Sequence, residues 1–79
     1  MEIPPELINL ERDAEEERAQ LAGLTGNDYE AQWRRWRRAS ETVQGAITAH
    51  AEAVEANRYE VEQAVKKAVR HAREDPAGE

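Results

Sequence analysis

Hydrophobic and small residues recur at alternating steps of four and three over most of the chain. The longest run of this spacing is an unbroken heptad repeat, which predicts a long α-helix with one seam packed against other helices. Gly45 is the only glycine or proline in it. We therefore predict one continuous helix over residues 28–74, roughly 70 Å long at about 1.5 Å per residue. Its seam consists of Tyr29, Trp33, Trp36, Ser40, Val43, Ile47, His50, Val54, Asn57, Val61, Ala64, Ala68 and His71.

A shorter run of the same spacing comes first. Pro4 and Pro5 suit a helix start, because the first turn does not need the N–H that proline lacks. Gly23 suits a left-handed helix end, and Asn27 with Glu30 predicts a capping box at the start of the long helix. The first helix is predicted over residues 5–22, with a seam of Leu7, Leu10, Ala14, Glu17 and Leu21.

Two such seams joined by a turn at residues 23–27 predict an all-α fold, an antiparallel helical hairpin with a short first and a long second helix. We expect a single domain over residues 1–79. Because Asp75 precedes Pro76, which disfavours helix, residues 75–79 are predicted to be a disordered tail. Folding the chain about Thr25 places Ala14 opposite Trp36. The predicted hairpin core is Leu7, Leu10, Ala14, Leu21, Tyr29, Trp33, Trp36 and Val43.

The unequal helix lengths predict a homodimer. The first helix covers the second only to about residue 47, and the apolar strip beyond predicts an interface that forms a four-helix bundle or coiled-coil-like assembly. β-Branched Val54 and Val61 favour parallel pairing. We nevertheless expect antiparallel pairing with Val54 opposite Ala64, because a parallel pair would stack His50 on His50 and Asn57 on Asn57. The predicted interface is Ile47, His50, Val54, Asn57, Val61, Ala64, Val65 and Ala68.

Composition supports this picture and excludes several functions. Of the 79 residues 35% are charged and 39% hydrophobic, many of the latter alanine, so a lone chain has little core to bury. Cysteine is absent, which excludes disulfides and thiolate chemistry. With neither a membrane-length apolar run nor a hydrophobic signal segment, we expect a cytoplasmic protein without a membrane span. The excess of arginine over lysine, with many alanines, is typical of bacteria with GC-rich genomes.

The most distinctive motif is Trp33-Arg34-Arg35-Trp36-Arg37-Arg38. One interpretation is an anion-binding surface, with arginines on phosphates and tryptophans stacking on bases or lying at a membrane interface. The other is structural: both tryptophans lie on the seam beneath the first helix, whose acidic residues neutralise the arginines. We expect the structural interpretation to hold. The candidate anion-binding residues are Arg34, Arg35, Arg37 and Arg38.

No residue constellation predicts catalysis. His50 and His71 are the only histidines. A metal site on a helix requires a second ligand three or four residues away from the first. His50 has none, and His71 has only Glu74, so we expect no metal and no cofactor. The chain has no Gly-rich phosphate loop, nucleophile elbow or Ser/His/Asp set, and we expect it not to be an enzyme.

These observations together predict a structural or regulatory module that acts through protein–protein interaction. We expect it to bind itself and a second, unidentified protein. The alternative is a nucleic-acid-binding accessory protein that uses the segment 33–38, although a net charge of −6 opposes binding to a polyanion.

Overall fold

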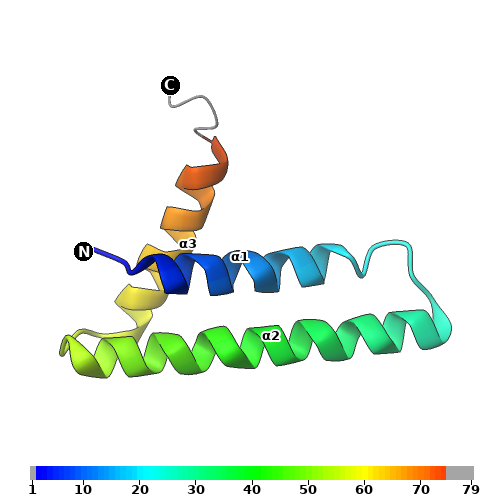
Figure 1. The fold of residues 1–79 in the computed structure, drawn as a ribbon, viewed down its shortest axis with the longest axis horizontal. Coiled ribbons are helices and arrows are strands. Elements are labelled where there is room, and N and C mark those ends of the chain that lie inside the picture. The colour runs from blue at the N-terminus through cyan, green and yellow to red at the C-terminus, as the bar shows by residue number, and fades with distance from the viewer. Residues whose placement is uncertain (1, 75–79) are drawn as a thin grey trace.

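Three helices make up the fold in a computed structural model that describes residues 2–74 (Figure 1). They are α1 (Pro5–Ala19), α2 (Gly26–Ala53) and α3 (Arg58–Glu74), and no strand occurs within the described range. The prediction of an all-α fold is confirmed. The tail predicted at residues 75–79 lies outside the described residues.

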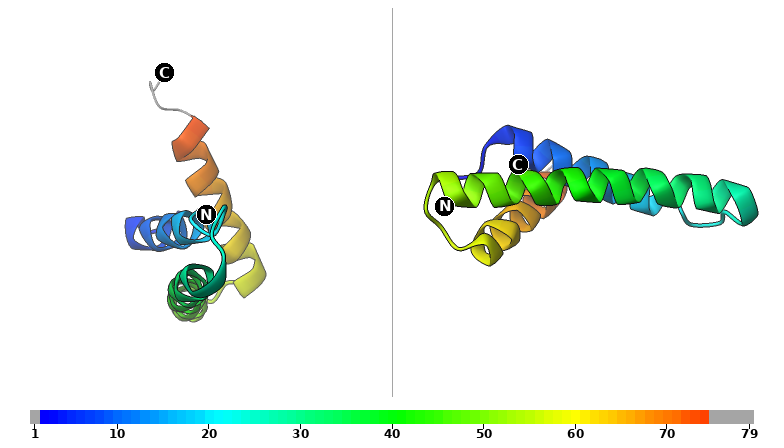
Figure 2. Two further views of the ribbon diagram at one scale, coloured as in Figure 1. Left: turned by 90° about the vertical axis from the view of Figure 1, so that its right-hand side faces the viewer. Right: turned by 90° about the horizontal axis from the view of Figure 1, so that it is seen from below.

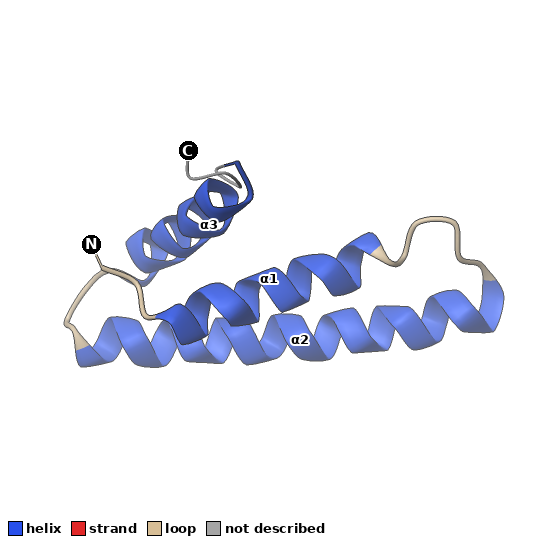
Figure 3. Cartoon of the chain, turned by 45° about the horizontal axis from the view of Figure 1, so that its top comes forward, coloured by secondary structure: helices blue, strands red, loops and turns tan. Residues whose placement is uncertain are grey.

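The first two helices run antiparallel side by side, and α3 turns back from the end of α2 to cross them steeply (Figures 1 and 3). Viewed along α2, α3 lies against one side of the α1–α2 pair (Figure 2). The N-terminal half of α2 extends beyond α3, so the two ends of this helix have different surroundings.

The connection between α1 and α2 departs slightly from the predicted boundaries. α1 ends at Ala19, before the predicted Ala22, and Gly23 adopts the expected left-handed conformation with φ of +83°. The predicted capping box at Asn27 is wrong. α2 instead follows Thr25, whose backbone is extended (φ −142°, ψ 164°) and whose side chain makes no capping hydrogen bond.

The predicted continuous helix over residues 28–74 is wrong, because the chain breaks at residues 54–57. The Ala56 N–H donates to the Ala51 carbonyl at 2.9 Å, and the Glu55 N–H donates to the Glu52 carbonyl at 3.3 Å. These two bonds form a Schellman motif, in which the left-handed position is usually glycine. Here it is Glu55, with φ of +57°.

Asn57 then starts α3 as its N-cap. Its side-chain Oδ1 accepts hydrogen bonds from the N–H groups of Tyr59 at 2.8 Å and Glu60 at 3.3 Å. Asparagine at this position satisfies donors that a helix start otherwise leaves unpaired. The sequence carried this signal: Asn57 followed three residues later by Glu60 is typical of a helix start. The heptad repeat, which continues through the break, obscured it.

The core forms where α3 folds back onto the other two helices. It contains Leu7 and Ala14 of α1, Val43, Ile47 and Ala51 of α2, and Val61 and Val65 of α3. Val61 and Val65 are fully buried, and burying a valine side chain is worth about 1.5–3 kcal/mol. In a single chain a continuous helix would leave these valines in water, which explains why the chain breaks despite the cost at Glu55.

Most residues of the predicted dimer interface therefore have other roles within one chain. Ile47, Val61 and Val65 are core residues, while His50, Ala64 and Ala68 are half-buried. Val54 and Asn57 lie in the break and are exposed. The antiparallel register that pairs Val54 with Ala64 requires a continuous helix, which this fold does not have, and the apolar strip that motivated a dimer is covered by α3 of the same chain.

Candidate interaction surface on α2

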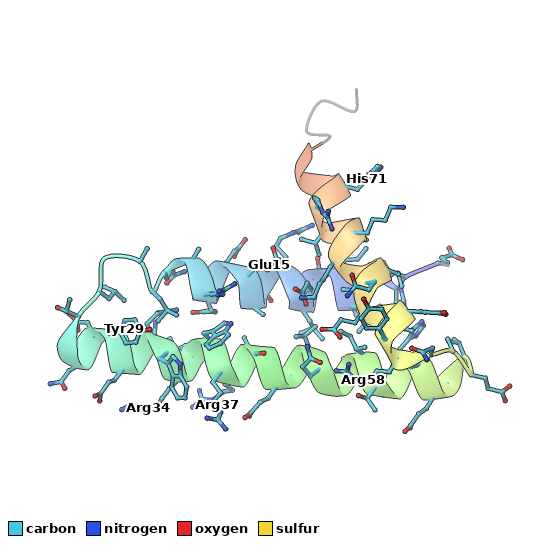
Figure 4. The ribbon with its side chains drawn as sticks, turned by 180° about the vertical axis from the view of Figure 1, so that it is seen from behind. Glu15, Tyr29, Arg34, Arg37, Arg58 and His71 are labelled. Carbon is cyan, nitrogen blue, oxygen red and sulfur yellow. The ribbon has the colours of Figure 1, made fainter. Side chains whose placement is uncertain are left out.

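The arginine-rich segment lies on the N-terminal half of α2, away from α3. All four arginines are exposed, and Figure 4 shows Arg34 and Arg37 pointing away from α1. Trp33 is also in contact with solvent, since this residue is 36% exposed. We call the exposed set the basic face; it consists of Trp33, Arg34, Arg35, Arg37 and Arg38.

Trp33 faces outward because Gln32 occupies the buried position beside α1. The Gln32 Nε2 donates to the carbonyl oxygen of Glu17 at 2.7 Å and to its Oε1 at 2.6 Å. The prediction that Trp33 packs beneath the first helix is therefore wrong. Gln32 stands four residues before Trp36 on one helical face, a second register of the same spacing that the sequence also offered.

The predicted hairpin core is divided by this shift. Because α1 ends at Ala19, no helix lies over Tyr29, which is 41% exposed. The prediction that Tyr29 is a core residue is therefore wrong. The structure buries Leu7, Ala14 and Val43, and half-buries Leu10, Leu21 and Trp36.

The aromatic part of the basic face is ordered by its own contacts. The Trp33 and Trp36 rings meet edge to face, with centroids 6.4 Å apart and planes at 64°. The guanidinium carbon of Arg37 lies 5.4 Å from the Trp33 ring centroid, within cation–π range. Arg37 also donates its Nε–H to Glu41 Oε2 at 3.2 Å. Two contacts thus hold Arg37 beside the exposed indole.

The acidic residues of α1 do not pair with these arginines. Asp13 and Glu17 line a shallow groove with Arg35 and Arg38, yet none of them forms an ion pair across it. Within residues 2–74 Arg34, Arg35 and Arg38 make no ion pair with any carboxylate. Among the described residues the expected neutralisation by direct ion pairs is not seen, and the side chains of Arg34, Arg35 and Arg38 are exposed.

A second charged cluster fastens α3 to α1. Lys66 Nζ lies 3.3 Å from Oε2 of Glu11, a residue only 4% exposed. Burial raises the pKa of Glu11, nearby Glu15 adds to the rise, and Lys66 opposes it. Figure 4 labels Glu15 on α1 beside this junction. Sequence analysis missed the cluster, because Glu11 and Lys66 are brought together only by the fold-back of α3.

Arg58 ties the start of α3 to α2. It donates to Thr48 Oγ1 at 3.0 Å, to Gln44 Oε1, and to Glu62 Oε1 at 3.2 Å. Thr48 and Gln44 belong to α2 and Glu62 belongs to α3, so the guanidinium group of Arg58 connects the two helices. This cluster and the Glu11–Lys66 pair use their charges within the chain, whereas on the basic face only Arg37 does so.

Neither a metal centre nor a membrane span emerges from residues 2–74. No group of three or more potential ligands among histidine, aspartate and glutamate gathers there. His50 is half-buried on α2, and His71 is exposed on α3. No helix in the same range is long and apolar enough to cross a bilayer.

Comparison with protein-family models, with curated proteins and with solved structures gives no match.

Proposed function

We propose that this protein is a non-enzymatic helical interaction module that contacts an acidic partner protein through the basic face of α2. The observation that carries the proposal is an exposed tryptophan, Trp33, in the same short segment as Arg34, Arg35 and Arg38, which make no ion pair within residues 2–74. Tryptophan and arginine dominate the binding energy of protein interfaces. Carboxylates are the natural partners of guanidinium groups.

The contacts at Trp33 favour binding with little reorganisation. The Trp33 indole already contacts the Trp36 ring edge to face and lies beneath the Arg37 guanidinium group. A side chain that is ordered before binding loses less conformational entropy when the complex forms. A partner with an apolar pocket rimmed by Asp and Glu would match this face.

A protein partner fits the charge distribution better than a nucleic acid. α1 carries six acidic and two basic residues and runs beside α2, with Asp13 and Glu17 at the edge of the basic face. An extended polyanion would meet these carboxylates, and the whole chain carries a net charge of −6. An acidic patch on a protein is local and can avoid α1.

Site-specific photo-crosslinking in the producing cells tests this proposal. Arg34→p-benzoylphenylalanine should crosslink to a protein, and the same label at Gln63, exposed on α3, should not. Adding Arg35→Gln, Arg37→Gln and Arg38→Gln should abolish the product. Equal crosslinking from positions 34 and 63 would show that the basic face is not the contact surface.

Single-stranded nucleic acid is the second candidate, favoured by the outward placement of Trp33 next to unpaired arginines. Bases stack on exposed aromatic rings, and phosphates pair with guanidinium groups. Tryptophan fluorescence titrated with an oligonucleotide at about 50 and 200 mM salt distinguishes the candidates, because phosphate-driven binding weakens steeply with salt. Absence of quenching at the lower salt would eliminate this candidate.

Homodimerisation is the remaining part of the proposal. Since α3 covers the apolar strip of its own chain, a dimer must either use another surface or exchange α3 between copies. The small size of the core in one chain of 79 residues supports a second copy. Of these two routes, exchange of α3 would depend on the break between α2 and α3.

A further inference from the structure

Residues 54–57, which we call the hinge, combine two opposing preferences. Their backbone reverses the chain through a Schellman motif with Glu55 at φ of +57°. A residue other than glycine is strained in this left-handed region. The sequence of the hinge is Val54-Glu55-Ala56-Asn57, without glycine or proline. Alanine and glutamate are good helix formers, and Asn57 is the hinge residue whose preference for an N-cap position favours the break.

The apolar pattern also continues across the hinge without a change of phase. Ile47, Val54 and Val61 follow one another at heptad spacing, and the spacing resumes into α3. If the hinge became helical, α2 and α3 would form one helix with a single apolar seam. The strain at Glu55 would be relieved, but the valines of α3 would lose their cover.

We propose that two copies of this chain exchange α3: the hinge straightens, and α3 of each copy packs onto α1 and α2 of the other. This inference deepens the homodimer part of the proposed function and is independent of the basic face. Exchange of an identical element is a low-cost route to a dimer, since every contact except those of the hinge is kept. A short strained hinge favours it.

The second copy is the occupant that fits the exposed surfaces. Once α3 leaves, fully buried Val61, Val65 and Val69 need an apolar groove, and the groove shaped to them is the one on an identical chain. The Lys66–Glu11 pair at 3.3 Å would form again between copies, so the buried carboxylate keeps its cation. The basic face lies outside the region that α3 covers, and the dimer would present two of them, which raises avidity for a repeated partner.

Hinge variants that favour one form over the other test the exchange. Asn57→Ala removes the cap that exists only in the folded-back form and improves helix propensity in the straight one. Glu55→Gly relieves strain in the folded-back form and weakens a helix. Each dimer contains two hinges, so we expect the dimer dissociation constant to fall roughly a hundred-fold for Asn57→Ala and to rise by a similar factor for Glu55→Gly.

The matched controls are Gln63→Ala and Gln63→Gly, at an exposed position that is helical in both forms. They should leave the dissociation constant, measured by sedimentation equilibrium, within about two-fold. The proposal is overturned if Asn57→Ala remains at the 9.0 kDa monomer mass at millimolar concentration, or if the two hinge variants shift association in the same direction.

Charge complementation tests which surfaces are exchanged. Glu11→Lys and Lys66→Glu each remove the ion pair within a chain, but mixing the two variants restores it only across an exchanged dimer. After joint refolding the mixture should melt higher than either variant and show twice the chain mass. If the melting curve of the mixture equals the sum of the curves of the two separate variants, the exchange is contradicted. If the protein proves to be monomeric but still crosslinks to a partner from position 34, the exchange is refuted and the proposed interaction through the basic face is not.

Discussion

The two ends of α2 share one helix and one apolar spacing but have opposite surroundings. The C-terminal end lies between α1 and α3, and its Val43, Ile47 and Ala51 are buried. The N-terminal end lies beyond α3, with Trp33 and its arginines in solvent. Periodicity alone therefore does not decide burial, because a seam is buried only as far as a second element covers it. Stability should therefore depend on one end and recognition on the other.

The largest expected effect compares the two ends directly. Ile47→Ala should lower the free energy of unfolding by about 2–5 kcal/mol, because it leaves a cavity among three helices. Trp33→Ala removes a larger side chain but should cost only about 1 kcal/mol, since what it loses is mainly the contact with Trp36. Urea unfolding followed by circular dichroism measures both. Equal losses would mean that Trp33 is buried in solution.

A second effect concerns the charged cluster at the junction of the covered end with α3. Burial beside Glu15 raises the pKa of Glu11 above its ordinary value of 4.5, with Lys66 opposing the rise. The folded state therefore binds this proton more tightly than the unfolded one. Its contribution to stability is fully present below pH 4.5 and is lost as the pH rises through the folded pKa.

The measurement is the unfolding free energy of the wild type minus that of Glu11→Gln across this pH range. This difference should decrease with rising pH. An increase with pH for Glu11→Gln would show that the attraction of Lys66 outweighs the cost of burial.

A smaller effect concerns the one arginine of the basic face that has partners. Arg37→Gln loses the exposed pair with Glu41 and the cation–π contact with Trp33. Each is worth roughly 0.5 kcal/mol at an exposed site, so the melting temperature should fall slightly. Glu41→Gln removes only the first contact and should cost about half as much. Equal losses for the two variants would assign no energy to the indole contact.

The smallest expected effect on stability tests most directly whether the N-terminal end of α2 serves recognition and not stability. Replacing Arg34, Arg35 and Arg38 together with Gln breaks no ion pair within residues 2–74. Unfolding free energy should change by less than about 0.5 kcal/mol, while crosslinking from position 37 to the partner should disappear. A clear loss of stability would restore the structural interpretation of the arginines.

Sequence analysis was right at two positions where local chemistry decides the conformation. Pro5 begins α1, and Gly23 takes the left-handed conformation after it. It was wrong at Trp33 and in the predicted continuous helix. Two registers of equal spacing compete at Gln32 and Trp33, and the length of α1 together with the Glu17 acceptor decides between them. Neither could be weighed before the helices were placed.

By itself the sequence determined that the chain is helical, where its first turn lies, and which residues are apolar enough to form a core. These properties follow from backbone sterics, capping and side-chain hydrophobicity, which act over a few residues. Three other properties depend on how the helices pack: α2 ends at Ala53, Lys66 contacts Glu11, and the arginines of α2 face solvent. The reason is that burying Val61 and Val65 outweighs the strain at Glu55, a balance between residues distant along the chain.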